Sequence, residues 1–365
     1  MLLELGKFAE AKAVIGEALA KAESTGNRRV GAAASLARMQ LLQHSGDSGG
    51  WTEATLELTT KTIPLLEQDG AHAELARAWR LVAMVQQSSG RMGQAVGTIA
   101  KVVEHARLAG DERLLARSAL GLTLCALYGP TPVAEAIAQC EGLIAGDMGD
   151  RQVQNLIVCK IAQLHLMSGD HETGRQNARS ARTVLRDLGQ GVRSASSSLD
   201  LAMLELLAGD PAAAERELRE DREMLEAMGE TYFLSTMVVV LARAVRDQGR
   251  DEEALELTRT AEQTAAPDDV DAQVLWRCVR APILARIGKI EGAENARAGR
   301  ARSGPPDGSA RLPSDRVVGA GRRPAHRRPA PRSTSRAGGG GGYLSAQGRR
   351  GLCRHDESRS RGPLK

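Results

Sequence analysis

Glycine recurs along this chain at a nearly fixed interval, and each is followed five positions later by another small residue. From Gly90 onward the interval is 39 or 40 residues, and the regular members are Gly6/Ala11, Gly49/Ala54, Gly90/Ala95, Gly169/Gly174, Gly209/Ala214, Gly249/Ala254 and Gly288/Ala293. A stretched version, Gly129/Ala136, contains Pro130 and Pro132. Self-similarity at such a period is the signature of a repeat protein, in which one small unit is stacked many times.

A second series of helix breakers lies between the members of the first. It comprises Gly26, Gly70, Gly110, Gly149, Gly189, Gly229 and, where the next glycine would fall, Pro267. Two breakers per period predict two helices of roughly 15 to 20 residues in each unit. Aromatic residues are only 2% of the chain although 42% is hydrophobic, which favours close-packed helices over strands. The sequence therefore predicts an all-α chain of stacked αα-hairpins.

Small residues mark both helices of each predicted hairpin. Seven positions before the turn glycine, the first helix carries Ala83, Ala162, Ala202, Ala242 or Ala281, and five positions after it the second helix carries the small residue of the first series. Small side chains at both places allow the paired helices to approach closely. We expect these positions to be buried at the contact within each hairpin.

This spacing resembles the tetratricopeptide repeat, and Trp79 stands where that family often has its first aromatic residue. The period here is about 40 rather than 34 residues, and glycine replaces the usual proline after the second helix. The resemblance implies an all-α, αα-hairpin (TPR-like) right-handed superhelical solenoid of about seven hairpins over residues 1–300, the first and last of them incomplete.

Two stretches, Gly209 to Glu215 and Ala266 to Arg277, resemble the C-terminal arm of bacterial class III adenylate/guanylate cyclase/AAA ATPase signalling proteins. This resemblance implies a non-catalytic protein-protein interaction solenoid that serves as the regulatory or sensor arm of a signalling ATPase or cyclase system. One alternative is a fragment of a cyclase or ATP-binding transcriptional regulator whose catalytic domains lie outside this chain.

Residues 301–365 have a different composition from the repeats. They hold about 15 Arg or Lys against about 4 Asp or Glu, so this segment alone carries a charge of about +11. The formal charge of the whole chain is only +4. Their Arg/Gly/Pro-rich sequence predicts a disordered tail, either a genuine basic tail or the product of a reading-frame shift. A second alternative function is thus non-specific nucleic-acid binding through this tail.

Location and partners follow from weaker signals. The N-terminus lacks the basic and apolar regions of a signal peptide, and the longest apolar run, Phe233 to Val245, is too short to cross a bilayer. Five scattered cysteines without a C-x-x-C motif indicate reduced thiols, four of them buried. We expect a cytoplasmic protein with no membrane association.

No residue pattern predicts catalysis, a cofactor or a metal. Gly338 to Gly342 has no following lysine, so it is not a phosphate-binding loop. Cys159, His165 and His171 are spaced onto different helix faces, which argues against a zinc site. Acidic residues at the starts of second helices, such as Asp210, Glu252 and Glu253, suit helix capping.

The concave groove remains as the candidate binding surface, because partner segments dock along the first helices of such solenoids. Fixed offsets from the turn glycines place groove residues in each unit, with an apolar middle that contains Leu156, Leu199 and Met203 and with arginines at both ends. An acidic-ended peptide or protein segment would suit this groove, whereas solvated arginines and ordinary repeat packing are the alternative interpretation. The predicted groove residues are Arg77, Arg80, Met84, Gln87, Met203, Arg243, Arg246 and Arg286.

Overall fold

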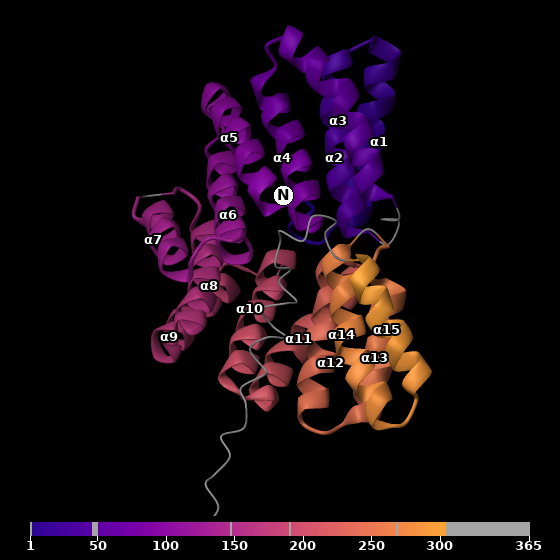
Figure 1. Cartoon of the computed structure of the whole chain (residues 1–365). Coiled ribbons are helices and arrows are strands. Elements are labelled where there is room, and N and C mark those ends of the chain that lie inside the picture. Colours follow the sequence, from indigo (N-terminus) through magenta and orange to yellow (C-terminus); the bar gives the residue numbers. More distant parts are fainter. Residues whose placement is uncertain (1, 46–49, 147, 190, 268, 304–365) are drawn as a thin grey trace, which may run out of the picture. The chain divides into compact units, whose positions relative to one another are not determined.

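The computed structural model describes residues 2–45, 50–146, 148–189, 191–267 and 269–303, and within them every regular element is a helix (Figure 1). The predicted tail therefore lies almost wholly outside the described residues, although its first residues belong to the last helix. The helices are α1 (Phe8–Thr25), α2 (Arg28–His44), α3 (Trp51–Gln68), α4 (His72–Ser88), α5 (Met92–Ala109), α6 (Glu112–Tyr128), α7 (Val133–Ile144), α8 (Arg151–Ser168), α9 (His171–Asp187), α10 (Val192–Ala208), α11 (Pro211–Met228), α12 (Tyr232–Asp247), α13 (Asp251–Thr264), α14 (Val270–Arg286) and α15 (Ile290–Ser303).

The even-numbered helices α2 to α14 are the first helices of successive hairpins, and the odd-numbered helices α3 to α15 are the second. Each first helix contacts the first helix of the next hairpin, and each second helix packs against its own hairpin partner. The all-α repeat fold predicted from the sequence is thus confirmed. The first helices form an inner layer, and the second helices cover it.

Glycine ends many of these helices because its backbone adopts the left-handed conformation. At Gly209, with φ +82°, the amides of Gly209 and Asp210 donate to the carbonyls of Leu206 and Glu205, which closes α10. The Asp210 side chain then accepts from the Ala213 amide at 2.9 Å and opens α11. The same aspartate cap begins α6, α8, α9 and α14.

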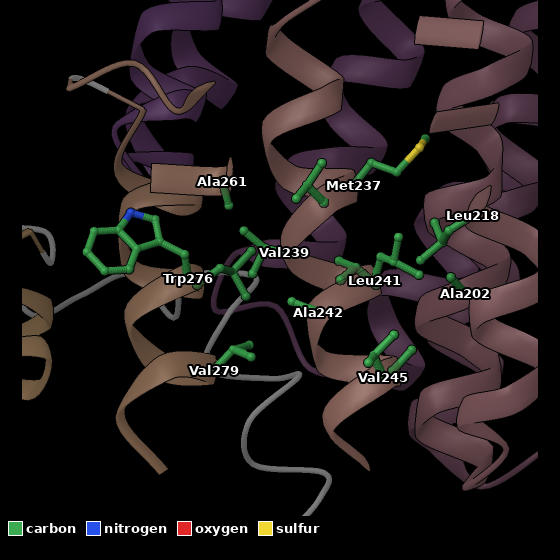
Figure 2. Close-up of a cluster of buried hydrophobic side chains, with 14 of the residues drawn as sticks. Ala202, Leu218, Met237, Val239, Leu241, Ala242, Val245, Ala261, Trp276 and Val279 are labelled. Carbon is green, nitrogen blue, oxygen red and sulfur yellow. The ribbon is translucent and has the colours of Figure 1, made fainter. Parts of the chain in front are cut away.

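The small residues of both series lie in the core, as the spacing predicted, except for Ala54, which is half-buried. Ala202, Ala214, Ala242 and Ala254 are all fully buried and belong to one cluster. Figure 2 shows this cluster, in which Leu218, Leu241 and Val245 pack beside the small residues. Small and large side chains therefore alternate at the contact between neighbouring helices, so that the helices lie close without leaving a void.

The structure departs from the repeat pattern in two places, and from one expectation about the cysteines. Gly129 is extended rather than left-handed, and the helix that follows its two prolines, α7, has only 12 residues. At the third turn the left-handed residue is Gly50, while Gly49 lies outside the described residues. Cys125, Cys140 and Cys159 are buried as expected, but the expectation is wrong for Cys278, which is half-buried.

Gly174 replaces the alanine of the other repeats because the neighbouring helix is unusually close. A Cβ atom at this position would lie 2.1 Å from Leu166 Cδ1 and 2.8 Å from the backbone oxygen of Ala162.

Gly97, also inside a helix, faces open space. We expect Gly97→Ala to raise the free energy of unfolding by about 0.5–1 kcal/mol through helix propensity, and Gly174→Ala to lower it by about 1–3 kcal/mol through overpacking. Urea unfolding followed by circular dichroism measures both, and equal effects of the two substitutions would contradict the packing argument.

Candidate functional site

A cavity of about 410 Å³ lies among the inner helices. All seven of the first helices, α2, α4, α6, α8, α10, α12 and α14, contribute side chains to its wall, and among the second helices only α5 does so. The repeat therefore directs one face of every hairpin towards the same space. The cavity therefore lies on the face of the first helices, where the sequence analysis places the candidate groove.

The inner layer closes because its first helix meets a helix near its other end. The helix α2 contacts α12, five hairpins further along the chain. At this junction the Thr231 amide donates to the His44 carbonyl at 3.1 Å, and His44 Nδ1 lies 2.8 Å from Glu230 Oε1. Phe8 stacks on the His44 ring. Polar and aromatic contacts thus hold together two segments that are 186 positions apart.

Residues 2–6 form part of the same junction. The Val192 amide at the start of α10 donates to the Glu4 carbonyl at 3.1 Å. Glycine permits this approach, since a Cβ atom on Gly191 would lie 2.6 Å from the Glu4 carbonyl oxygen. A Cβ atom on Gly6 would lie 2.6 Å from Met228 Sδ. The side chains of Leu3 and Glu4 contribute to the cavity wall.

Much of the wall is apolar and contains flexible side chains. Methionines from α4, α5 and α10 line it together with leucines from four helices and with aromatic rings from α6 and α12. Thioether side chains adapt to irregular partners. The apolar lining comprises Leu3, Ala83, Met84, Met92, Ile99, Val102, Leu120, Leu124, Tyr128, Leu156, Val192, Leu199, Met203, Phe233, Val240 and Leu275.

Three arginines, one each from α4, α6 and α10, form a basic cluster on the wall. Arg117 and Arg193 both pair with Oε1 of Glu4, the latter at 3.4 Å. Burial, together with the neighbouring charge of Arg193, lowers the pKa of Arg80 and of Arg117 to about 10. The guanidinium groups therefore lie in a poorly solvated place and repel one another, yet they stay protonated at neutral pH.

A buried ion pair lies elsewhere on the wall. The Lys160 ammonium and the Gln163 amide both bind Oδ1 of Asp200, and the side chain of Asp200 is 4% exposed. Burial raises the pKa of Asp200, and the Lys160 charge opposes this rise. Lys160 and Asp200 are one repeat period apart, so the pair joins α8 to α10 across successive hairpins.

The structure separates the predicted groove residues into two groups. Arg80, Met84, Gln87 and Met203 line the cavity, and Gln87 also donates to the Gly121 carbonyl at 2.9 Å. The other four lie outside the cavity wall: Arg77 is exposed, Arg243 is buried beside Asp247, Arg246 pairs with Asp247, and Arg286 pairs with Asp251.

The groove mapping missed Arg117, Arg193 and Glu4. Arg193 lies six residues before Leu199, the first groove position in its helix, and Arg117 belongs to the hairpin with the stretched turn, which has no regular offset. Extending the groove positions by about two helical turns reaches Arg193. No sequence signal associates Glu4 with these arginines, because the contact depends on closure of the inner layer.

Among the described residues, no group of three or more His, Cys, Asp or Glu side chains is placed to hold a metal ion. Cys159 is fully buried, and His165 lies near Glu141 and Asp170 instead. Over the same part of the chain, no helix is long and apolar enough to cross a membrane.

Comparisons with known proteins support the fold. Neither the scan against protein-family models nor the search of curated proteins finds a match. Among solved structures, the chain is similar to a Rap protein complexed with competence and sporulation factor, with a TM-score of 0.55 and 12% sequence identity over 83% of this chain and 94% of that chain. The likeness at this identity is one of fold, and the fold is a tetratricopeptide-like helical repeat.

Removing one partner of the buried pair is expected to be costly. Lys160→Met leaves the Asp200 carboxylate without its cation and should lower the free energy of unfolding by about 3–5 kcal/mol at pH 7. Lys61→Met, at an exposed pair with Glu57, is the control and should change it by less than about 0.5 kcal/mol.

The loss should also depend on pH. In the Lys160→Met chain, the pKa of Asp200 is higher in the folded state than in the unfolded state. The contribution of Asp200 to stability is therefore complete when Asp200 is protonated, and it is lost as the pH rises through the folded-state pKa. The deficit relative to the unsubstituted chain should therefore shrink as the pH falls from 7 towards about 4. Guanidinium unfolding across this range measures it, and a pH-independent deficit would exclude the uncompensated carboxylate as its cause.

Proposed function

We propose that this chain is a non-catalytic binding solenoid whose inner cavity takes up a short segment of a peptide or of a partner protein. One observation carries the proposal: every first helix of the repeat directs side chains to the same cavity. A wall used only for packing would be filled by its own side chains, as the clusters between the helices are.

The size and composition of the cavity suit such a ligand. Its volume of about 410 Å³ is within the usual range of ligand sites, about 300–1,000 Å³. Apolar side chains would supply most of the contact area, and the arginines and acidic groups would orient the bound segment. Methionines on three helices give the wall the adaptability found on surfaces that accept several sequences.

The solved Rap protein of similar fold is complexed with competence and sporulation factor. A structure with this fold thus accommodates a bound factor, which supports a binding role for this chain. We extend the proposal to a cytoplasmic regulatory or sensor arm of a bacterial signalling ATPase or cyclase system. The residues that support this are Gly209 to Glu215 and Ala266 to Arg277, which resemble such arms.

The alternative is a piece of a cyclase or ATP-binding regulator whose catalytic domains lie outside this chain. The two interpretations differ in whether catalysis is carried on the same polypeptide. Reading the coding frame upstream of Met1 separates them, since a continuous frame that encodes a cyclase or ATPase domain would favour the alternative. The solenoid has the same binding role in both.

Filling the cavity tests the binding role directly. A random heptapeptide phage library selected on the full chain should enrich a family of related sequences. Met203→Trp should reduce the binding of their synthetic forms by at least about tenfold, because the indole occupies the space of the ligand. Leu108→Trp, at a position 61% exposed on α5, is the matched control and should leave binding unchanged.

Two outcomes would contradict the proposal. One is an unselective library, with no sequence family enriched after repeated selection. The other is a set of peptides that bind the Met203→Trp chain as tightly as the unsubstituted chain, which would place the binding surface outside the cavity. Circular dichroism of both variants checks that the helical fold is retained.

A further inference from the structure

The arginine cluster formed by Arg80, Arg117 and Arg193 contains more positive charge than its neighbours neutralise. Glu4 pairs with Arg117 and Arg193. Asp150 is close enough to affect the pKa of both, but one of its oxygens accepts from the Val153 amide at the start of α8. Three guanidinium groups thus face two carboxylates, of which only Glu4 makes an ion pair with them among the described residues.

Arg80 is the unpaired member of this cluster. The residue is half-buried and lines the cavity, and no hydrogen bond or ion pair joins its side chain to another residue that the structure describes. The Nε atom of Arg117 is also buried without a hydrogen-bond partner in the described part of the chain. Keeping an unpaired charge partly withdrawn from water costs free energy. A ligand that supplies an anion would recover that cost.

The segment Leu2 to Gly6 shows what kind of ligand fits. Glu4 brings a carboxylate to two of the arginines, its carbonyl accepts from the Val192 amide, and Leu3 covers the adjoining apolar wall. An acidic residue flanked by apolar residues therefore already meets this wall in favourable chemistry. The planar fork of arginine matches the two oxygens of a carboxylate particularly well.

We propose that Arg80, Arg117 and Arg193 form a carboxylate-binding subsite that recognises an acidic side chain within an apolar peptide segment, and that Glu4 is a tethered competitor for it. This rests on the proposed peptide-binding role of the cavity and adds the chemistry of the ligand. A bound acidic segment pairs with Arg80 and displaces the Glu4 carboxylate from Arg117 and Arg193. A ligand therefore binds only if its carboxylate competes successfully with that of Glu4 for Arg117 and Arg193.

The probe for the test is the sequence of the segment itself. Acetyl-Leu-Leu-Glu-Leu-Gly-amide and its glutamine counterpart differ only in the charge of one side chain. Isothermal titration calorimetry with the full chain carrying Glu4→Gln should show about tenfold tighter binding of the glutamate peptide, since a hydrogen bond to a charged group is worth about 1.5–3 kcal/mol and 1.4 kcal/mol is tenfold. The unsubstituted chain should bind the same peptide more weakly, because Glu4 competes.

Arg80→Met in the Glu4→Gln background should reduce the preference for glutamate to less than about twofold. Arg77→Met is the matched control, since Arg77 is exposed on the same helix and lies outside the cavity wall, and it should preserve the preference. Equal binding of both peptides to Glu4→Gln would overturn the carboxylate subsite while leaving the cavity a peptide site. Absence of binding by the glutamate peptide would also overturn it, and the phage selection would then decide the wider function.

A second measurement separates a binding residue from a structural one. Without peptide, Arg80→Met should leave the thermal midpoint of the full chain unchanged or raise it, because an unpaired and poorly solvated charge is removed. Arg117→Met should lower the midpoint, because Glu4 loses its partner. A fall after Arg80→Met as large as that after Arg117→Met would assign Arg80 to the packing of the fold and contradict the proposal.

Discussion

The close contact between the two helices of each hairpin is the constraint on which the rest of the structure depends. Alanine or glycine on both sides brings the helix backbones together, and Ala242 with Ala254 is the clearest example. Because the same contact recurs in the regular hairpins, each of them presents the same face of its first helix to the interior. The cavity wall is a consequence of this repetition, since no single hairpin contributes more than a small part of it.

Buried ion pairs complement this packing by joining successive hairpins. Arg182 of α9 pairs with Asp221 of α11, and Lys160 of α8 pairs with Asp200 of α10, so in both cases the partners are about one period apart. Burial raises the pKa of Asp221 as it does that of Asp200. Such pairs add little net stability, but a wrong neighbour would leave a buried charge unpaired. They therefore favour one register between repeats whose apolar surfaces are much alike.

The sequence predicted those features that depend on short spacings. Helices, turns, aspartate caps and buried alanines each depend on residues within one or two helical turns, so Gly209, Asp210 and Ala214 could be placed without a structure. Half of the predicted groove, Arg80, Met84, Gln87 and Met203, lines the cavity for the same reason. Arg243, Arg246 and Arg286 are different, because each has an acidic partner within or near its own hairpin. The number of residues between a position and the turn glycine predicts which way a side chain points. It does not predict whether an acidic side chain nearby will pair with it.

Closure of the inner layer could not be predicted, because it depends on small angular differences between hairpins that add up along the chain. The contact between His44 and Glu230 joins segments 186 positions apart, and the contact between Glu4 and Arg117 joins segments 113 positions apart. Neither pair follows the repeat period. Both lie where the start of the chain meets later hairpins, and the second lies beside Arg80. A repeat protein can place its least repetitive interactions at such a junction, since substitutions there alter one site and leave the contacts within the other hairpins intact. Recognition of a particular ligand would then depend on the junction, while stability depends on the repeats.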